Sequence, residues 1–67
     1  MSFDEIRLEL KKGKQAKRQD WGGSIKYAPD PRGTQTFVYL MTGSDGLKSF
    51  HDLTDEDRKA TDWSVVL

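Results

Sequence analysis

The first ten residues place apolar side chains three or four positions apart, which is the spacing of an amphipathic helix. Phe3, Ile6 and Leu10 share one face of such a helix. Ser2 with Glu5 three residues later forms the capping-box pattern, which satisfies free backbone amides at a helix start. The pattern therefore predicts an N-terminal helix that buries this stripe.

The chain then changes to an alternating pattern. Gly13 suits the left-handed position after a helix, and residues 14–21 read as a strand that ends at Trp21. Gly22-Gly23 predicts a tight turn, and residues 24–28 follow as a second strand. We expect these two strands to form a hairpin.

The middle of the chain contains its most apolar segment. Residues 29–34 hold two prolines and a glycine and predict a loop. Residues 35–41 predict a strand that is apolar on both faces, with Phe37, Tyr39 and Met41 on one side and Val38 and Leu40 on the other. Such a strand needs cover on both sides. We expect the helix to provide one cover and a neighbouring subunit the other.

The last third predicts a turn over residues 42–46 and a fourth strand over 47–50. Thr54 and Asp57 repeat the capping box in an aspartate form and predict a helix of one or two turns. Trp63, Val65 and Leu67 alternate as a final strand. The predicted fold is a single α+β domain over 1–67, with a small antiparallel sheet of four to five strands packed by the N-terminal helix and a second short helix before the last strand.

The composition predicts a thin core. The chain has 67 residues, of which 34% are hydrophobic, and it has no cysteine, so neither disulfides nor thiolate-bound zinc can stabilise it. The lone His51 has no cluster of ligand-spaced neighbours, so we expect no metal site. Small domains without such links often gain stability by oligomerising. We therefore expect a homo-oligomer.

Charge excludes a generic nucleic-acid binder, because eleven basic residues balance eleven acidic ones. Residues 1–34 carry eight basic and five acidic residues, a net of +3, and residues 35–67 carry three and six, a net of −3. A local basic patch could hold one or two phosphates: Lys11, Lys12, Lys14, Lys17 and Arg18. No apolar run reaches transmembrane length and the N-terminus is too charged for a signal peptide, so we expect a cytoplasmic protein and no membrane partner.

Signals for an enzyme are poor. His51-Asp52 could be half of an acid–base pair, but adjacent strand residues point to opposite faces. Ser44 and Ser49 have no nucleophile elbow around them, and the glycines match no phosphate-loop spacing. We interpret His51 as a turn or surface histidine and predict a protein that is not an enzyme and needs no cofactor.

Signals for binding are better. Trp21 beside Lys14, Lys17 and Arg18 combines a stacking plane with cations, which suits a nucleotide base and its phosphates. The alternative is that Trp21 anchors the small core while the cations are solvated. Pattern alone favours the core interpretation and leaves both open.

Both ends of the chain resemble a phage and bacterial family, the second class of Thoeris anti-defence proteins. The opening "SFDEIRLELKKGKQAKRQDW" and the closing "FHDLTDEDRKATDWSVV" carry the resemblance. The matching positions are Phe3, Leu10, Gly13, Lys14, Arg18, Trp21, Asp45-Gly46, Ala60, Asp62, Trp63 and Val65. Arg58 and Lys59 depart from the family pattern, which has an apolar pair there.

The resemblance implies a sponge that assembles as a dimer or tetramer. Such a protein binds and sequesters an immune signalling nucleotide, a cyclic ADP-ribose isomer or a cyclic dinucleotide, without cleaving it. If the chain is phage-encoded, it would act in the host cytoplasm. The resemblance suggests that Trp21 and Phe3 stack on adenine and that Arg18 and Lys14 bind the pyrophosphate. It suggests Asp62 and Tyr27 for the ribose hydroxyls.

Two other functions remain alternatives. The chain could be a protein–protein inhibitor that docks on a host enzyme through Leu8 and its mixed-charge faces. It could also bind single-stranded nucleic acid through the basic strand, but the zero net charge argues against that interpretation.

Overall fold

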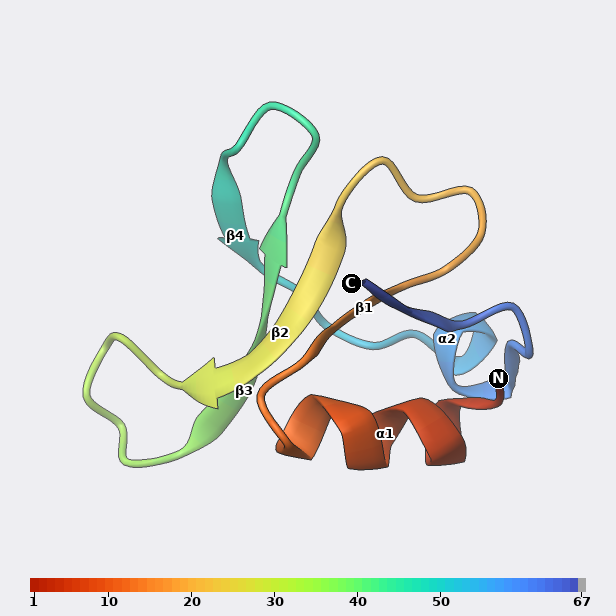
Figure 1. The fold of residues 1–67 in the computed structure, drawn as a ribbon. Coiled ribbons are helices and arrows are strands. Elements are labelled where there is room, and N and C mark those ends of the chain that lie inside the picture. The colour runs from red at the N-terminus through yellow and green to blue at the C-terminus, as the bar shows by residue number, and fades with distance from the viewer. Residues whose placement is uncertain (67) are drawn as a thin grey trace.

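A computed structural model describes residues 1–66, and it confirms the predicted α+β fold (Figure 1). Its elements are two helices, α1 (Phe3–Lys11) and α2 (Asp55–Lys59), and five strands, β1 (Gln15–Lys17), β2 (Ser24–Pro29), β3 (Phe37–Thr42), β4 (Lys48–Phe50) and β5 (Ser64–Val66). The strands form one antiparallel sheet in the order β4-β3-β2-β1-β5. The second helix precedes the last strand, as predicted.

Both helices begin at the capping boxes that the sequence indicates. The Ser2 hydroxyl accepts from the Glu5 amide, and the Glu5 carboxylate accepts from the Ser2 amide. Thr54 and Asp57 make the same reciprocal pair at α2. Gly13 has φ +92°, so the left-handed position after α1 is confirmed.

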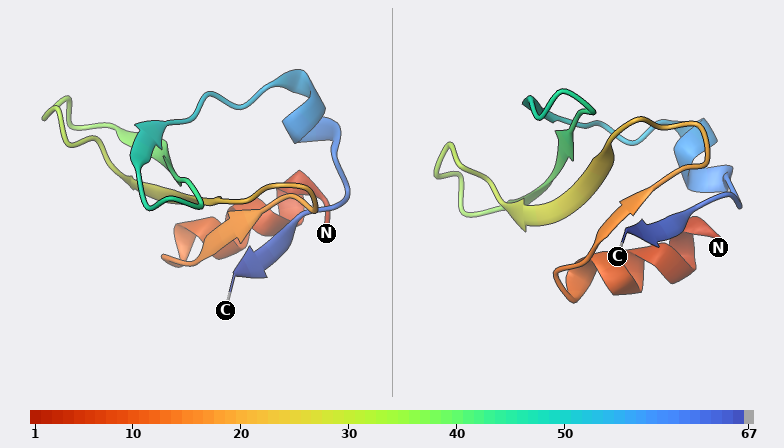
Figure 2. Two further views of the ribbon diagram at one scale, coloured as in Figure 1. Left: turned by 90° about the horizontal axis from the view of Figure 1, so that it is seen from above. Right: turned by 45° about the horizontal axis from the view of Figure 1, so that its top comes forward.

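The core lies where α1 packs on one face of the sheet (Figure 2). It is formed by the predicted stripe of α1 together with one residue each from β1 and β2 and a tryptophan: Phe3, Ile6, Leu10, Ala16, Ile25 and Trp63. The N-terminus is fixed to the chain that leads into β5, because the Met1 ammonium donates to the carbonyls of Thr61 and Trp63.

The first strand is shorter than predicted. β1 ends at Lys17, and residues 18–23 form the connection to β2 instead of a two-residue Gly-Gly turn. The hairpin itself is confirmed, since Gln15 pairs with Lys26 and Ala16 with Ile25. The backbone amide of Trp21 donates to the Arg18 carbonyl at 3.1 Å, a turn within this loop. Trp21 is therefore a loop residue, and the prediction that it ends a strand was wrong.

The other strand boundaries shift by one or two residues. β2 extends through Pro29, and β3 covers 37–42 where the sequence predicted 35–41. β4 covers 48–50 where 47–50 was predicted. The final strand begins at Ser64, so it contains Val65 as predicted but not Trp63, while Leu67 lies outside the described residues. No helix within residues 1–66 is long and apolar enough to cross a membrane.

Candidate functional site

A buried carboxylate, Asp57, holds the centre of a polar cluster beside Trp21. Its side chain is 6% exposed and faces Arg18, 39 positions away in sequence, and His51, six positions away. Arg18 Nη1 donates to Asp57 Oδ1 at 3.0 Å, and His51 Nε2 lies 3.1 Å from Asp57 Oδ2. Because an ionised carboxylate only accepts, His51 Nε2 carries the proton in this bond. We call Arg18, His51 and Asp57 the Asp57 cluster.

Arg18 connects this cluster to a second carboxylate. Its Nε donates to Asp62 Oδ1 at 3.0 Å, and the backbone amide of Gln19 donates to Asp62 Oδ2 at 3.3 Å. These bonds fix the loop after β1 against the segment before β5. The Arg18 bond holds the pKa of the Asp62 carboxyl below its usual value, and the two carboxylates raise the pKa of Arg18.

Burial alone would raise the pKa of Asp57, but hydrogen bonds from the Thr54 amide, Arg18 and His51 together lower it below its usual value. Asp57 is thus a carboxylate at neutral pH despite its burial. Its backbone carbonyl also accepts from the Trp63 indole N–H at 2.9 Å. Asp57 therefore orients Arg18, His51 and the buried Trp63.

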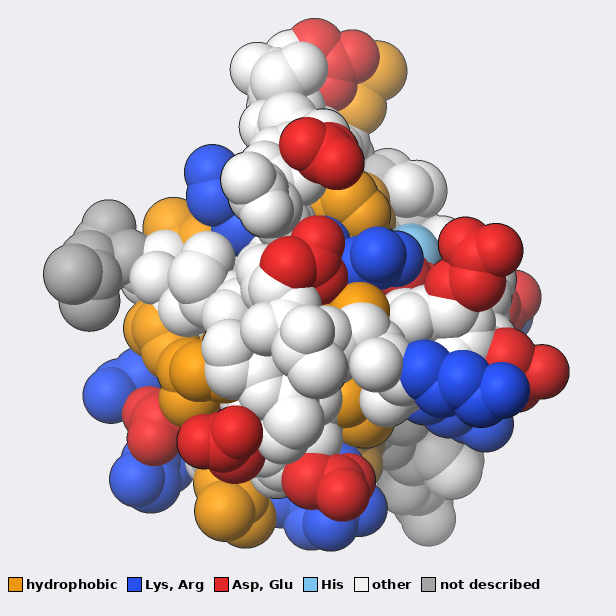
Figure 3. Space-filling view, turned by 90° about the vertical axis from the view of Figure 1, so that its right-hand side faces the viewer, with side chains coloured by type: hydrophobic (Ala, Val, Ile, Leu, Met, Phe, Trp, Pro, Cys, Tyr) orange, Lys and Arg blue, Asp and Glu red, His pale blue; other side chains and the backbone are white. Residues whose placement is uncertain are grey.

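His51 is not the simple turn or surface residue that the sequence indicated. Its side chain is 20% exposed and its ring meets the Trp21 ring edge-on, with centroids 5.1 Å apart. Figure 3 shows acidic and basic side chains interspersed over one face of the molecule. The partners that cover His51 come from α2 and the loop after β1, which no local pattern around it indicates.

Trp21 is partly buried, so its position combines the two alternatives that the sequence left open. One edge of the indole packs on the core, at 5.1 Å between ring centroids from Trp63. The side chain also lines an open recess of about 180 Å³ together with Arg18, Asp20 and Asp62. We call this the Trp21 recess. Three of the six sequence-predicted binding residues therefore meet at one place.

The other three predicted binding residues lie elsewhere. Phe3 is 9% exposed in the core, in contact with Trp63 and Tyr39 at 5.7 and 6.4 Å between centroids. Lys14 pairs with Glu9 at 2.8 Å on the side of α1. The Tyr27 ring packs at a tilt against the rings of Tyr39 and Phe37 in the sheet. None of them lines the Trp21 recess.

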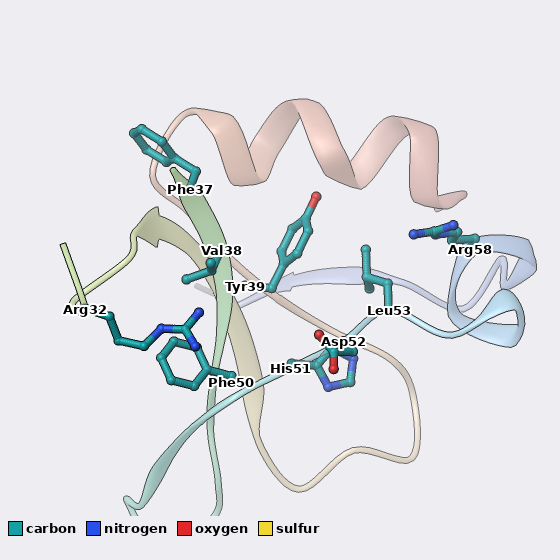
Figure 4. Close-up of a pocket in the computed structure, with 9 residues that line it drawn as sticks. All are labelled: Arg32, Phe37, Val38, Tyr39, Phe50, His51, Asp52, Leu53 and Arg58. Carbon is teal, nitrogen blue, oxygen red and sulfur yellow. The ribbon is translucent and has the colours of Figure 1, made fainter. Parts of the chain in front are cut away.

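A larger pocket of about 440 Å³ lies where β4 ends and the chain separates from β3 (Figure 4). β4 pairs with β3 from Leu40 to Thr42, so residues 37–39 at the start of β3 have no β4 partner. Beyond Phe50, the His51 amide donates to the Tyr39 carbonyl at 2.9 Å. The apolar lining is Phe37, Val38, Tyr39, Phe50 and Leu53; the polar lining is Arg32, His51, Asp52 and Arg58. We call this the β3 pocket. His51 touches both this pocket and Trp21.

Sequence reasoning missed Asp20, Asp57 and the whole β3 pocket. The capping box identified Asp57 as a helix-start residue, yet nothing in the pattern linked it to Arg18, 39 positions away. Within residues 1–66, no group of three or more histidines, cysteines or acidic residues is arranged to hold a metal ion.

Comparison with known proteins gives one family. A profile described as the Thoeris anti-defense 2-like domain matches residues 1–66 of the chain. No curated protein matches the sequence. The match extends over the N-terminal helix, the whole sheet and the Trp21 recess.

Proposed function

The chain belongs to the Thoeris anti-defense 2-like family, and from this membership we propose that it binds and sequesters an immune signalling nucleotide without cleaving it. The family gives the chain a Thoeris anti-defence role. A cyclic ADP-ribose isomer or a cyclic dinucleotide is the proposed ligand. The proposed mode of action is depletion, in which the bound messenger never reaches its effector.

The observation that carries this proposal is the convergence of Trp21, Arg18 and Asp62 in one recess. The indole offers a stacking surface for a base, an interaction worth roughly 1–3 kcal/mol. Its inner edge is held by Trp63 and His51, so the ring is oriented before any ligand arrives. Preorganisation of this kind reduces the entropy lost on binding.

Polar groups beside the ring suit the rest of a nucleotide. Arg18 uses Nε and Nη1 for its two carboxylates, which leaves Nη2 outside those bonds to donate to a phosphate oxygen. Asp20 and Asp62 carry acceptor oxygens for ribose hydroxyls. Phe3 contacts Trp63, the ring on which Trp21 packs.

The recess is too small to enclose such a ligand alone. Its volume of about 180 Å³ is below the roughly 300–1,000 Å³ of typical small-molecule sites. We propose that a second copy of the chain completes it, as a dimer or tetramer. Met1 and Val66 are exposed apolar side chains that could make such contacts, and Val66 lies on β5 at the edge of the sheet.

Equilibrium dialysis against cyclic ADP-ribose isomers and cyclic dinucleotides tests the proposal. We expect retention of at least one messenger, and chromatography after heat denaturation should recover it intact. Recovery of a linear product would overturn sequestration, and no retention of any messenger would overturn binding.

Variants locate the binding to the recess. Trp21→Ala should weaken messenger binding by about tenfold or more, because stacking is lost. Since Trp21 also contacts the core, Trp21→Phe serves as a second variant that keeps an aromatic ring there. Leu47→Ala, in an exposed turn, is the control and should bind as the parent does. Equal affinity in all three variants would contradict the assignment.

The subunit requirement has its own measurement. Light scattering during size-exclusion chromatography should give a mass of two or four chains, and ligand should shift the equilibrium towards the assembly. A monomer that binds messenger with full affinity would contradict completion by a second copy.

Leu8 favours a second candidate function, a protein–protein inhibitor that docks on a host protein. It is 57% exposed on the outer face of α1. Pull-down from bacterial lysate with the parent chain and with Leu8→Glu separates the two functions. Docking predicts a stoichiometric host partner that Leu8→Glu loses, whereas sequestration predicts none and unchanged messenger binding.

A further inference from the structure

We propose that the β3 pocket is a second ligand site, separate from the Trp21 recess, for a planar aromatic ring that carries an anionic group. The pocket, at about 440 Å³, lies within the range of small-molecule sites, whereas the recess does not. None of the residues that line the recess lines this pocket. The proposal does not depend on nucleotide sequestration.

One end of the pocket suits an aromatic ring. Phe37 and Phe50 are 55% and 48% exposed, so each presents apolar surface that a ligand would remove from water. The Arg32 guanidinium lies over the Phe50 ring, 4.3 Å from its centroid. Aromatic and guanidinium planes are both surfaces on which a flat ring stacks.

Arg32 is held in this position by a buried carboxylate. Asp30 is 7% exposed and accepts from Arg32 Nε and Nη2, at 3.0 and 2.8 Å. Thr34 donates to the same carboxylate, so Asp30 has its own fixed orientation. These bonds orient the Arg32 guanidinium over Phe50. Because Asp30 offsets the charge of Arg32, an anion must be held elsewhere.

The other end supplies that charge. In Figure 4 Arg58 extends from α2 at the far side from Phe50, with Tyr39 and Leu53 between them. No ion pair is found for Arg58 within residues 1–66. A guanidinium with no carboxylate partner can take a phosphate or a carboxylate bidentately. The ring would lie at the Phe50 end and the anion at the Arg58 end.

The remaining polar groups add specificity between the two ends. Burial raises the pKa of Tyr39, so its hydroxyl keeps its proton at neutral pH and can donate. Asp52 provides an acceptor for an amine or hydroxyl of the ligand. The lining sums to +1, from two arginines and one aspartate with His51 neutral.

Calorimetry and amide NMR with two probes test the site and separate the sources of the anion. Adenosine 5′-monophosphate supplies a phosphate and 1-naphthoate supplies a carboxylate. We expect at least one to bind and to shift amide signals in residues 37–39 and 50–53. Adenosine alone and inorganic phosphate alone should each bind about tenfold more weakly. No binding of either probe at millimolar concentration overturns the proposal, as does phosphate that binds as tightly as the nucleotide.

Paired variants locate the anion. Arg58→Gln should weaken binding of the better probe about tenfold, because a charged hydrogen bond is lost. Lys59→Gln removes the neighbouring exposed cation of the same helix turn and should change affinity by less than about twofold. Phe50→Leu should cost about tenfold through lost stacking. Equal effects of Arg58→Gln and Lys59→Gln overturn the site and indicate unspecific attraction.

The two sites are distinguished by crossed variants. Trp21→Phe should leave probe binding at the β3 pocket unchanged, and Arg58→Gln should leave messenger retention unchanged. Failure of messenger retention alone contradicts the proposed function and leaves this inference intact. The probe titration is repeated at protein concentrations where the chain self-associates. If probe binding is lost there, a second copy fills the pocket and the inference is overturned.

Discussion

At the scale of single residues, Asp57 explains most of the local geometry. Its carboxylate accepts from the Thr54 amide at the start of α2, from Arg18 and from His51. A buried carboxylate with several donors is stable only while those donors remain in place. Because the Asp57 carboxylate accepts from the Thr54 amide, Arg18 and His51, its loss should disturb the start of α2, the loop after β1 and the ring beside Trp21.

We therefore expect Asp57→Ala to lower the free energy of unfolding by about 3 kcal/mol, since Arg18 and the α2 amide lose a buried partner. Urea denaturation monitored by tryptophan fluorescence measures this change. Asp55→Ala, an exposed carboxylate in the first turn of the same helix, is the matched control and should cost about 0.5 kcal/mol or less. Similar losses in the two variants would contradict the central role of Asp57.

At the scale of elements, the loop after β1 shows where sequence patterns reach their limit. Alternation continues through residues 14–21, so the pattern extended the strand to Trp21. The side-chain bonds of Asp62 with Arg18 and Gln19 draw the chain out of the sheet instead. The two helix starts were predictable because the capping box is a local pattern, in which every partner lies within three residues.

The two glycines of this loop differ in what surrounds them. A Cβ on Gly23 would overlap the Thr42 carbonyl oxygen and lie 2.9 Å from Gly43 Cα, whereas on Gly22 it would meet Ser44 Cβ at 3.4 Å. We expect Gly23→Ala to destabilise the fold by about 1–3 kcal/mol through overpacking where β2 meets the end of β3.

Gly22→Ala is the matched control and should stay within about 1 kcal/mol of the parent in thermal or urea unfolding. Equal effects of the two substitutions would contradict the requirement for a glycine at position 23.

At the scale of the whole molecule, acid should destabilise the fold. Within residues 1–66, five carboxyl groups have pKa values held below their usual range by hydrogen bonds or ion pairs: Glu5, Glu9, Asp30, Asp57 and Asp62. A lowered folded-state pKa means that the unfolded chain takes up protons first as pH falls. The stability they contribute is complete above the unfolded-state values near pH 4 and is lost as pH drops through the lower folded-state values.

The thermal midpoint should accordingly be nearly constant from about pH 7 to pH 5.5 and fall steeply below about pH 4. Differential scanning calorimetry across this range measures the profile. Asp30→Asn should flatten the acid side of the profile, because it removes a group whose pKa lies far below its usual value. A midpoint that is the same at pH 3 and pH 7 would contradict the linkage.

The sequence by itself determined the helices, their starts, the α1 stripe in the core and the antiparallel sheet, because caps and hydrophobic periodicity depend on neighbours within a few residues. Tertiary structure decided what surrounds Trp21 and His51, since Asp57 and Asp62 reach Arg18 across about 40 positions. It also decided the β3 pocket, which forms because β4 pairs with β3 from Leu40 to Thr42 and leaves the start of β3 without a β4 partner. Contacts between distant segments depend on how the chain packs, and no local pattern encodes them.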